Sequence, residues 1–260
     1  MVMELPLLLI LTVWVNARGV QSALPPNCSY PPSQWCSSLD SAAQCGVLKQ
    51  CLERDFIRSR QTAEPVEVAL YYESLCPGCR LFLVEMLFPS WILASGIMSV
   101  ALVPYGNAEE KVVGHKYVYQ CQHGEQECLG NTIEACVMNM TGPAAFPIIF
   151  CMESAADVIK AAESCVGVYS NVSWSSIMSC VKGDLGMQLM HQNALMTAAL
   201  KPPHEYVPWV TINGEHTDDL QKQAMSNLLG LVCNKYKGTK PDTCVMGQHS
   251  QHFRSYCHNN

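Results

Sequence analysis

The sequence is poor in charge and has no run of basic residues. Only 15% of its 260 residues are charged, while 49% are hydrophobic, which excludes an intrinsically disordered chain. The formal net charge is −6, and without a basic cluster nucleic acid is not an expected partner. The length predicts one or two globular domains with a sizeable core.

Long apolar runs are also missing. The run from Leu7 to Val15 is too short to span a bilayer comfortably, and we expect no stable membrane insertion elsewhere. We interpret residues 1–23 as a signal peptide cleaved near residues 22–23, although the segment carries Glu4 and no Lys or Arg. A membrane anchor is the alternative. The chain ends in SYCHNN, without a Lys-Asp-Glu-Leu-type retention signal, which favours export from the endoplasmic reticulum.

Cysteine, by contrast, is abundant. The chain has 15 cysteines, and disulfides persist in oxidising compartments. Three N-x-S/T sequons, at Asn27, Asn139 and Asn171, are candidate glycosylation sites. Together with the leader they predict a glycoprotein of the secretory pathway.

Residues 28–51 hold four cysteines with the spacing C-x7-C-x8-C-x5-C. Such density predicts a disulfide-stapled module too small for a core of its own; a generic cysteine-rich segment is the alternative. The segment resembles the saposin A-type domain, which implies a removable, propeptide-like unit. The residues that carry this resemblance are Trp35, Cys36, Ala43, Cys45, Gly46, Val47 and Cys51.

A polar connector, LERDFIRSRQTAEP, follows at 52–65. Its three arginines make it a candidate for proteolytic trimming, with a solvated helix end as the alternative. We therefore expect residues 24–64 to be the saposin A-type segment and linker, a propeptide. Residues 65–236 are then the main domain, and 237–260 a trimmed C-terminal tail.

A strand-like run, VEVALYY at 66–72, leads into Cys76-Pro-Gly-Cys79, and a helical run follows from Arg80 to Phe88. We expect Pro89 to end or kink that helix. A zinc site would need a second closely spaced pair of ligands, which the other cysteines do not offer, so we expect no metal. A static disulfide is the remaining alternative to a redox-active pair.

Thiol–disulfide exchange needs an attacking thiolate and a second thiol that releases the mixed disulfide. Cys76 falls at the helix start, where unpaired N–H groups and the helix dipole favour its thiolate. Cys79 can lie on the same face. We assign Cys76 as the nucleophile and Cys79 as the resolving thiol. Pro77 suits the first turn of a helix, and Gly78 completes the active loop.

The remaining order is a strand at 97–105, helices near 131–138, 152–165, 173–181 and 184–200, a short strand at 207–214 and a helix at 217–236. This order resembles an α/β thioredoxin-like fold with a helical insertion. The resemblance implies a cis-proline that faces the active pair, at Pro208. His204 and Trp209 flank it, as lining of a substrate groove or as core.

A second constellation is more specific. Residues 121–136, CQHGEQECLGNTIEAC, are similar to the signature C-Q-H-G-x2-E-C-x2-N-x4-C of the gamma-interferon-inducible lysosomal thiol reductase family. The stretches LVPYGNA, GDLGMQLMH and PPHEYVPWVTING resemble that family too, so the likeness covers about residues 66–235. The signature positions are Cys121, Gln122, His123, Gly124, Glu127, Cys128, Asn131 and Cys136.

This resemblance implies a thiol reductase that opens protein disulfides in lysosomes at acid pH and aids unfolding, proteolysis and antigen processing. It implies no cofactor beyond an external small thiol, such as cysteine or glutathione, and a protein that is partly secreted. The alternatives are a secretory-pathway disulfide oxidase or isomerase, and a non-enzymatic disulfide-stapled secreted binding protein. Near pH 4.5 an unperturbed thiol would be ionised in about one molecule in ten thousand, so the pKa of Cys76 must be lowered.

We expect the signature cysteines to form structural disulfides, and His123 either to tune a nearby thiolate or to be an ordinary loop residue. If the four N-terminal cysteines and the active pair are set aside, nine of the 15 cysteines remain, an odd number, so one is unpaired or intermolecular. Cys257, in the tail, is the candidate for an inter-chain disulfide in a precursor dimer.

Overall fold

The computed structural model describes residues 28, 30, 34–48, 51, 62–114 and 116–244. The predicted signal peptide, Asn27, most of the polar connector and Cys257 lie outside these residues. The domain boundaries of the two ends therefore stay predictions.

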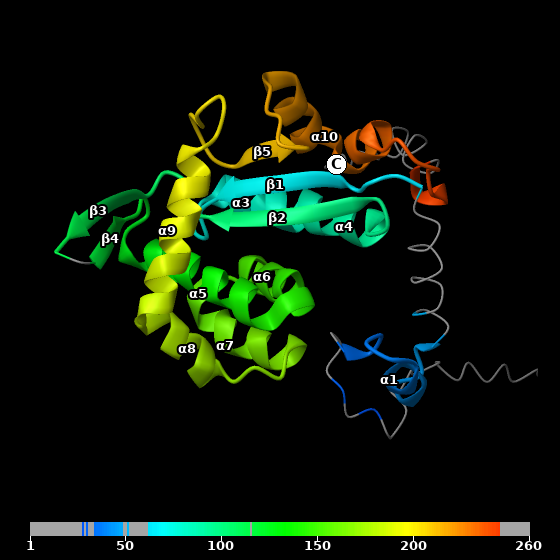
Figure 1. Cartoon of the computed structure of the whole chain (residues 1–260), viewed down its shortest axis with the longest axis horizontal. Helices are drawn as coiled ribbons and strands as arrows, with labels where there is room; N and C mark the ends of the chain where they lie inside the picture. Colours follow the sequence, from blue (N-terminus) through cyan, green and yellow to red (C-terminus); the bar gives the residue numbers. More distant parts are fainter. Residues whose placement is uncertain are drawn as a thin grey trace, which may run out of the picture.

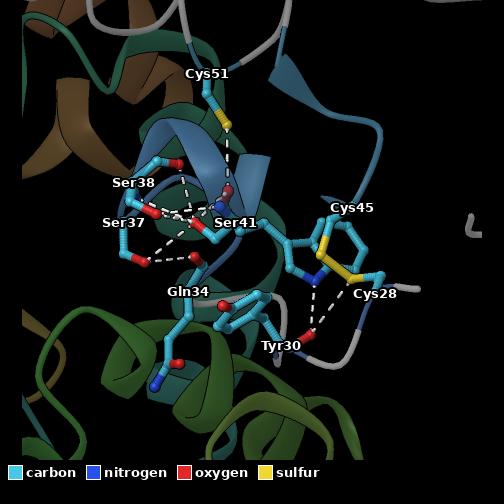
Figure 2. The surroundings of a disulfide bond; sticks show 9 residues. Cys28, Tyr30, Gln34, Ser37, Ser38, Ser41, Cys45 and Cys51 are labelled. Atoms are coloured by element: carbon cyan, nitrogen blue, oxygen red, sulfur yellow. Dashed lines mark hydrogen bonds between the residues drawn. A yellow bond between two sulfur atoms is a disulfide. The ribbon is translucent and has the colours of Figure 1, made fainter. Parts of the chain in front are cut away.

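The N-terminal segment is organised by two disulfides, Cys28–Cys45 and Cys36–Cys51, which close loops across helix α1 (Leu39–Gln44). The helix begins at a capping box: the Ser38 hydroxyl accepts from the Ser41 N–H, and the Ser41 hydroxyl accepts from the Ser38 N–H (Figure 2). The two bridges fix a segment with few buried apolar side chains, as the cysteine spacing predicts.

A three-stranded sheet is the centre of the main domain (Figure 1). Strand β1 (Val66–Tyr72) lies between β2 (Met98–Pro104), which is parallel to it, and β5 (Trp209–Ile212), which is antiparallel. All residues of β1 except Glu67 are buried, because a central strand covered on both faces reads as a continuous apolar run.

The chain that leaves β1 forms one continuous helical stretch: α3 (Pro77–Phe82), the π-helical turn η2 (Leu83–Leu87) and α4 (Phe88–Ala94). Of the two outcomes expected at Pro89, an end of the helix is wrong, because the helix continues to Ala94. Pro89 occupies the first turn of α4, and the wider π turn before it accommodates the missing N–H and the pyrrolidine ring.

Helices α5 (Glu125–Thr141), α6 (Ala145–Ser154), α7 (Val158–Tyr169), α8 (Trp174–Lys182) and α9 (Asp184–Ala198) form the insertion between β2 and β5, with the 3-10 turn η3 (Gly142–Ala144) after α5. Disulfides join α5 to α8 through Cys136–Cys180 and α6 to α7 through Cys151–Cys165. Figure 1 shows this helical layer on one side of the sheet and α10 (Asp218–Lys235) beside β5.

A short hairpin, β3 (Glu109–Val113) and β4 (Lys116–Gln120), extends from the domain between β2 and α5 (Figure 1). The sequence reading missed it, because neither strand has a buried face: every residue of the pair is exposed or half-buried. The helix expected at 131–138 also begins earlier, at Glu125, inside the signature.

Two segments, Pro77–Ala94 and Glu125–Ser154, are long and apolar enough by composition alone to cross a membrane. Both place large side chains in the shared core, among them Phe82, Leu87 and Ile149. We interpret them as core helices of a folded domain. The α/β prediction, a thioredoxin-like fold with a helical insertion, is confirmed by the order of strands and helices around the sheet.

Candidate active site

Cys76 and Cys79 lie at the junction between β1 and α3. Cys76 is the N-cap of α3, and its sulfur accepts a hydrogen bond from the Cys79 N–H at 3.4 Å. Pro77 occupies the first helical position, where its missing N–H has no intrahelical partner to lose. Both sulfurs are free thiols; Cys76 is 9% exposed and Cys79 is fully buried.

The environment separates the acidities of these two thiols. The pKa of Cys76 falls to about 6, chiefly because the Cys79 thiol donates a hydrogen bond to it and the N–H groups of Cys79 and Gly78 add to this, while burial opposes them. The pKa of Cys79 rises far above its ordinary value, because it is the donor in that bond and is buried. Cys76 can therefore be a thiolate while Cys79 keeps its proton.

Pro208 approaches this loop from the other side. The Val207–Pro208 bond is cis, as the resemblance to the thioredoxin-like fold implies, and Pro208 Cδ lies 3.6 Å from where a Cβ on Gly78 would be. Gln221, buried on α10, holds the segment: its side-chain amide donates to Pro208 O at 2.9 Å and its Oε1 accepts from Val210 N–H at 3.0 Å. The strand β5 therefore presents the proline at a fixed place.

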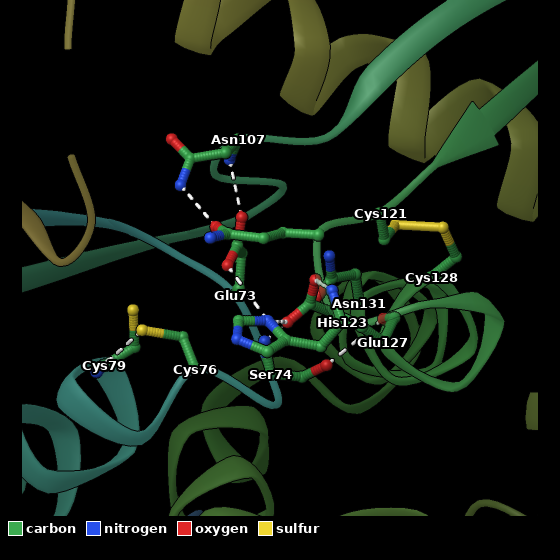
Figure 3. Close-up of polar contacts among 11 residues, drawn as sticks. Glu73, Ser74, Cys76, Cys79, Asn107, Cys121, His123, Glu127, Cys128 and Asn131 are labelled. Carbon is green, nitrogen blue, oxygen red and sulfur yellow. Dashed lines mark hydrogen bonds and ion pairs between the residues drawn. A yellow bond between two sulfur atoms is a disulfide. The ribbon is translucent and has the colours of Figure 1, made fainter. Parts of the chain in front are cut away.

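The polar residues of the signature pack around the loop that precedes Cys76 (Figure 3). Asn131 Oδ1 accepts from the Ser74 N–H at 2.9 Å, and the Ser74 hydroxyl donates to Glu127 O at 3.2 Å. A Cβ at Gly130 would come 2.3 Å from Ser74 Oγ, so the close approach requires glycine there. The start of α5 thus fixes the loop that carries the nucleophile.

Glu73, in the same loop, is fully buried. Its Oε1 accepts from the Asn107 N–H at 2.7 Å. Burial is the main reason that its pKa rises to about 7, and the nearby Glu127 and Cys76 raise it further, against the Asn107 bond and His123. Gly106 makes room for this carboxyl: it has φ +60°, and a Cβ there would lie 2.4 Å from Glu73 Cγ.

His123 completes this cluster. Its ring Nδ1 lies 2.5 Å from Glu127 Oε2 and 3.5 Å from Glu73 Oε2. Its backbone N–H donates to Glu127 Oε1 at 2.9 Å. The candidate ligand atoms of the three residues lie within 4.8 Å of one another. Because Glu127 and Asn107 already engage most of these atoms, we interpret the group as a hydrogen-bonded acid–base cluster and assign it no metal.

A second buried acidic group lies behind α3. The Tyr72 hydroxyl donates to Glu134 Oε2 at 2.5 Å, and Arg80 lies with its Nε 3.5 Å from Glu153 Oε2 and donates to the backbone carbonyls of Glu153 and Ala155. Burial raises the pKa of Glu134 to about 7 and that of Glu153 well above its ordinary value. The two carboxyl groups can bond to each other only when one carries a proton.

The other residues predicted from the sequence lie in disulfides, in the core or on the surface. Two of the signature cysteines pair as Cys121–Cys128, and Cys136 pairs with Cys180, which confirms structural disulfides. Trp209 is 3% exposed and stacks on His216 with ring centroids 3.4 Å apart, so it is core and not groove lining. The exposed side chains of Asn139 and Asn171 are open to glycosylation.

The sequence reading missed Glu73, Asn107 and Gln221. A charged residue directly after a buried strand and three positions before the nucleophile was the available signal for Glu73. Asn107 and Gln221 act through contacts across 34 and 13 residues of sequence, which no local pattern reports.

Two family models match the chain. The one described as "Gamma interferon inducible lysosomal thiol reductase (GILT)" matches residues 67–169, and "Saposin A-type domain" matches residues 25–54. Both lie where the two resemblances in the sequence fall.

Curated relatives match over most of their length. The chain is 59% identical over 234 residues to "Gamma-interferon-inducible lysosomal thiol reductase" of Carassius auratus, an alignment that covers 90% of each protein. It is 51% identical over 183 residues to the Mus musculus protein of the same name, covering 69% of this chain and 72% of that one. Among solved structures, DsbA of Chlamydia trachomatis matches with a TM-score of 0.44 and 14% identity, over 65% of this chain and 89% of that chain.

Proposed function

The chain belongs to the gamma-interferon-inducible lysosomal thiol reductase family, and from that premise we propose that it reduces disulfide bonds of proteins in lysosomes at acid pH. One observation carries the proposal: two free thiols at the start of α3, of which Cys76 has a pKa of about 6 and Cys79 keeps its proton. Because this family consists of thiol reductases, the chain is an enzyme, and we drop the alternative of a non-enzymatic binding protein.

In the proposed cycle the Cys76 thiolate attacks one sulfur of the substrate disulfide, whose S–S bond breaks. The product is a mixed disulfide between Cys76 and the substrate. The Cys79 sulfur then attacks Cys76, releases the second substrate sulfur and leaves a Cys76–Cys79 disulfide. An external small thiol, of the cysteine or glutathione class, returns the pair to its reduced form. Both electrons come from sulfur, so these steps need no prosthetic group.

The acidity of Cys76 supports work at low pH. With a pKa of about 6, about 3% of Cys76 would be thiolate at pH 4.5, against about 0.01% for an ordinary thiol. Acid also loosens folded substrates, because carboxylates paired in their native states become protonated. Substrate disulfides would then be exposed for attack, which would aid proteolysis and antigen processing.

Maturation and targeting belong to the same proposal. A signal peptide over residues 1–23 would direct the chain into the secretory pathway, with delivery to lysosomes and partial secretion. Removal of residues 24–64 and 237–260 would leave residues 65–236 as the mature domain, and Cys257 would link precursors into a dimer. The exposed sequons at Asn139 and Asn171 support glycosylation on that route.

The test is reduction of a denatured, disulfide-bonded protein by the purified full chain at pH about 4.5 and about 7, with Cys76→Ser and Cys79→Ser variants beside it. We expect turnover at acid pH, none with Cys76→Ser, and a trapped mixed disulfide with Cys79→Ser. No turnover at either pH, or a mixed disulfide that forms through Cys79 in the Cys76→Ser variant, would contradict the assignment.

One observation favours a second function, oxidation or isomerisation in the secretory pathway. A stabilised Cys76 thiolate stabilises the reduced enzyme, and a stable reduced form makes a disulfide a stronger oxidant. The two functions separate by direction: an oxidase forms disulfides in a reduced substrate near pH 7, whereas the proposed reductase opens them at pH about 4.5.

A further inference from the structure

The His123 imidazole lies between two glutamate side chains and Cys76 (Figure 3). His123 Nδ1 contacts Glu127 Oε2 at 2.5 Å and lies 3.5 Å from Glu73 Oε2. Figure 3 shows the His123 ring between these carboxyl groups and Cys76, with its second nitrogen on the Cys76 side. Carboxylates that accept from Nδ1 fix the orientation and tautomer of a histidine and leave Nε2 for the reacting group.

We propose that His123, oriented by Glu73 and Glu127, forms a thiolate–imidazolium pair with Cys76 that raises the ionised share of the attacking sulfur in acid. The inference deepens the proposed reductase function and rests on it. Glu73 and Glu127 are positioning residues in this arrangement, because they act through the imidazole. It gives the histidine of the family signature a role at the cysteine pair.

The electrostatics of the loop agree with such a pair. An opposite charge within about 4–6 Å lowers the pKa of an acid by about 1–3 units. The hydrogen bond from Cys79 is the largest influence that lowers the pKa of Cys76, and the charge of His123 lowers it further. A cationic imidazole on the Cys76 side of this loop would therefore favour the thiolate.

Glu73 changes its charge between acid and neutral pH. Its pKa of about 7, raised chiefly by burial, leaves it neutral at pH 4.5, so Glu73 adds no negative charge beside the thiolate there. At neutral pH its carboxylate would compete with the Cys76 thiolate for the imidazolium. Other titratable groups lie near this loop: Cys79 on α3, Glu73 after β1, His123 and Glu127 at the start of α5, and Glu153 on α6. Arg80 lies against Glu153, and His204 lies beside Gly106.

The protons and electrons of the cycle balance with this pair. The enzyme starts with a Cys76 thiolate, a Cys79 thiol and a His123 imidazolium. When Cys76 attacks, the first substrate sulfur leaves and takes the proton of His123. When Cys79 attacks Cys76, the second substrate sulfur leaves with the proton that Cys79 gives up. Two electrons pass from the enzyme dithiol to the substrate disulfide, and the reduced enzyme supplies both protons.

The test measures ionisation of Cys76 directly, in the reduced full chain, by thiolate absorbance near 240 nm and by the pH dependence of alkylation. His123→Gln keeps a donor for Glu127 but removes the charge. We expect the pKa of Cys76 to rise by about 1 unit, the lower end of the effect of a nearby opposite charge, because the larger contribution of the Cys79 hydrogen bond is kept. His123→Asn, a second neutral variant, should give the same direction. Glu73→Gln should not raise the pKa of Cys76, because it removes a group whose ionised form opposes the thiolate.

His191 provides a matched control. Its Nδ1 lies 2.9 Å from Glu110 Oε2, on α9 and the hairpin, so His191→Gln removes a histidine–glutamate pair away from the cysteines and should leave the Cys76 titration unchanged. A Cys76 titration in His123→Gln and His123→Asn that equals the wild type, or an equal rise in His191→Gln, overturns the pair. Because these readouts need no turnover, they decide the pair even if wild-type protein fails to reduce disulfides, which would overturn the proposed function instead.

Discussion

Replacement of Glu134 by Gln should flatten the dependence of this protein's stability on pH. Glu134 is fully buried beside Glu153, and Glu134 Oε1 and both Glu153 carboxyl oxygens lack a hydrogen-bond donor. A carboxyl group in this position is stable only while neutral or paired. The amide of Gln keeps an acceptor for the Tyr72 hydroxyl and adds a donor for Glu153, so the variant should fold.

The sign and size follow from the pKa of Glu134, which burial raises from 4.5 to about 7. Between these values the folded protein binds a proton that the unfolded chain has released, so the free energy of unfolding falls as pH rises. The contribution is complete below pH about 4.5 and is lost as pH rises through about 7. A difference of about 2.5 pH units, at about 1.36 kcal/mol each, amounts to about 3 kcal/mol.

Urea and thermal unfolding between pH 4.5 and 7.5 would measure this. In wild type, the Glu134 contribution of about 3 kcal/mol alone corresponds to a fall in Tm of about 6–12 °C over that range. Glu134→Gln should lose that part of the fall and keep the part due to Glu73. Glu163→Gln, an exposed position on α7, should keep the wild-type slope. A wild-type stability that does not fall with pH, or a Glu134→Gln curve as steep as wild type, would refute the reasoning.

Two further predictions concern the packing around the cysteine loop. Gly106→Ala should destabilise the protein by about 2–4 kcal/mol in urea unfolding, because it adds left-handed strain and a Cβ against Glu73. The control is Gly114→Ala, with φ +64° and nothing within 4 Å, which should lose only about 1 kcal/mol. Equal losses in the two variants would contradict the close contact between residue 106 and Glu73. Gln221→Leu should lose about 2–4 kcal/mol by leaving two backbone groups beside Pro208 unpaired, whereas exposed Gln223→Leu should change stability by less than about 0.5 kcal/mol.

The sequence could predict the elements that have local signals. The apolar run before Cys76, the proline at the first helical position and the Val-Pro step before a short strand each specify backbone geometry near themselves. They were enough to place the nucleophile and the order of elements, while the cis-proline came from the resemblance of that order to the thioredoxin-like fold.

Contacts between distant segments had no such signal. The signature residues are 53 and 57 positions from Ser74, to which they bond, and the need for glycine at 106 comes from a carboxyl 33 residues earlier. The β3–β4 hairpin has no buried face, so its apolar periodicity is weak. These features follow from tertiary packing, which overrides local patterns.

In the proposed cycle the disulfides of the helical insertion would meet the same small thiol that regenerates the cysteine pair. Cys136 and Cys180, which join α5 to α8, are 0% and 5% exposed. A thiolate attacks only a sulfur that it can reach along the S–S axis, so the folded interior would shield this bond from cysteine, glutathione and other copies of the enzyme. Unfolding would remove that shield. Whether a copy of this chain acts as reductant or as substrate would then depend on its conformation. A denatured copy would become a substrate for the native ones.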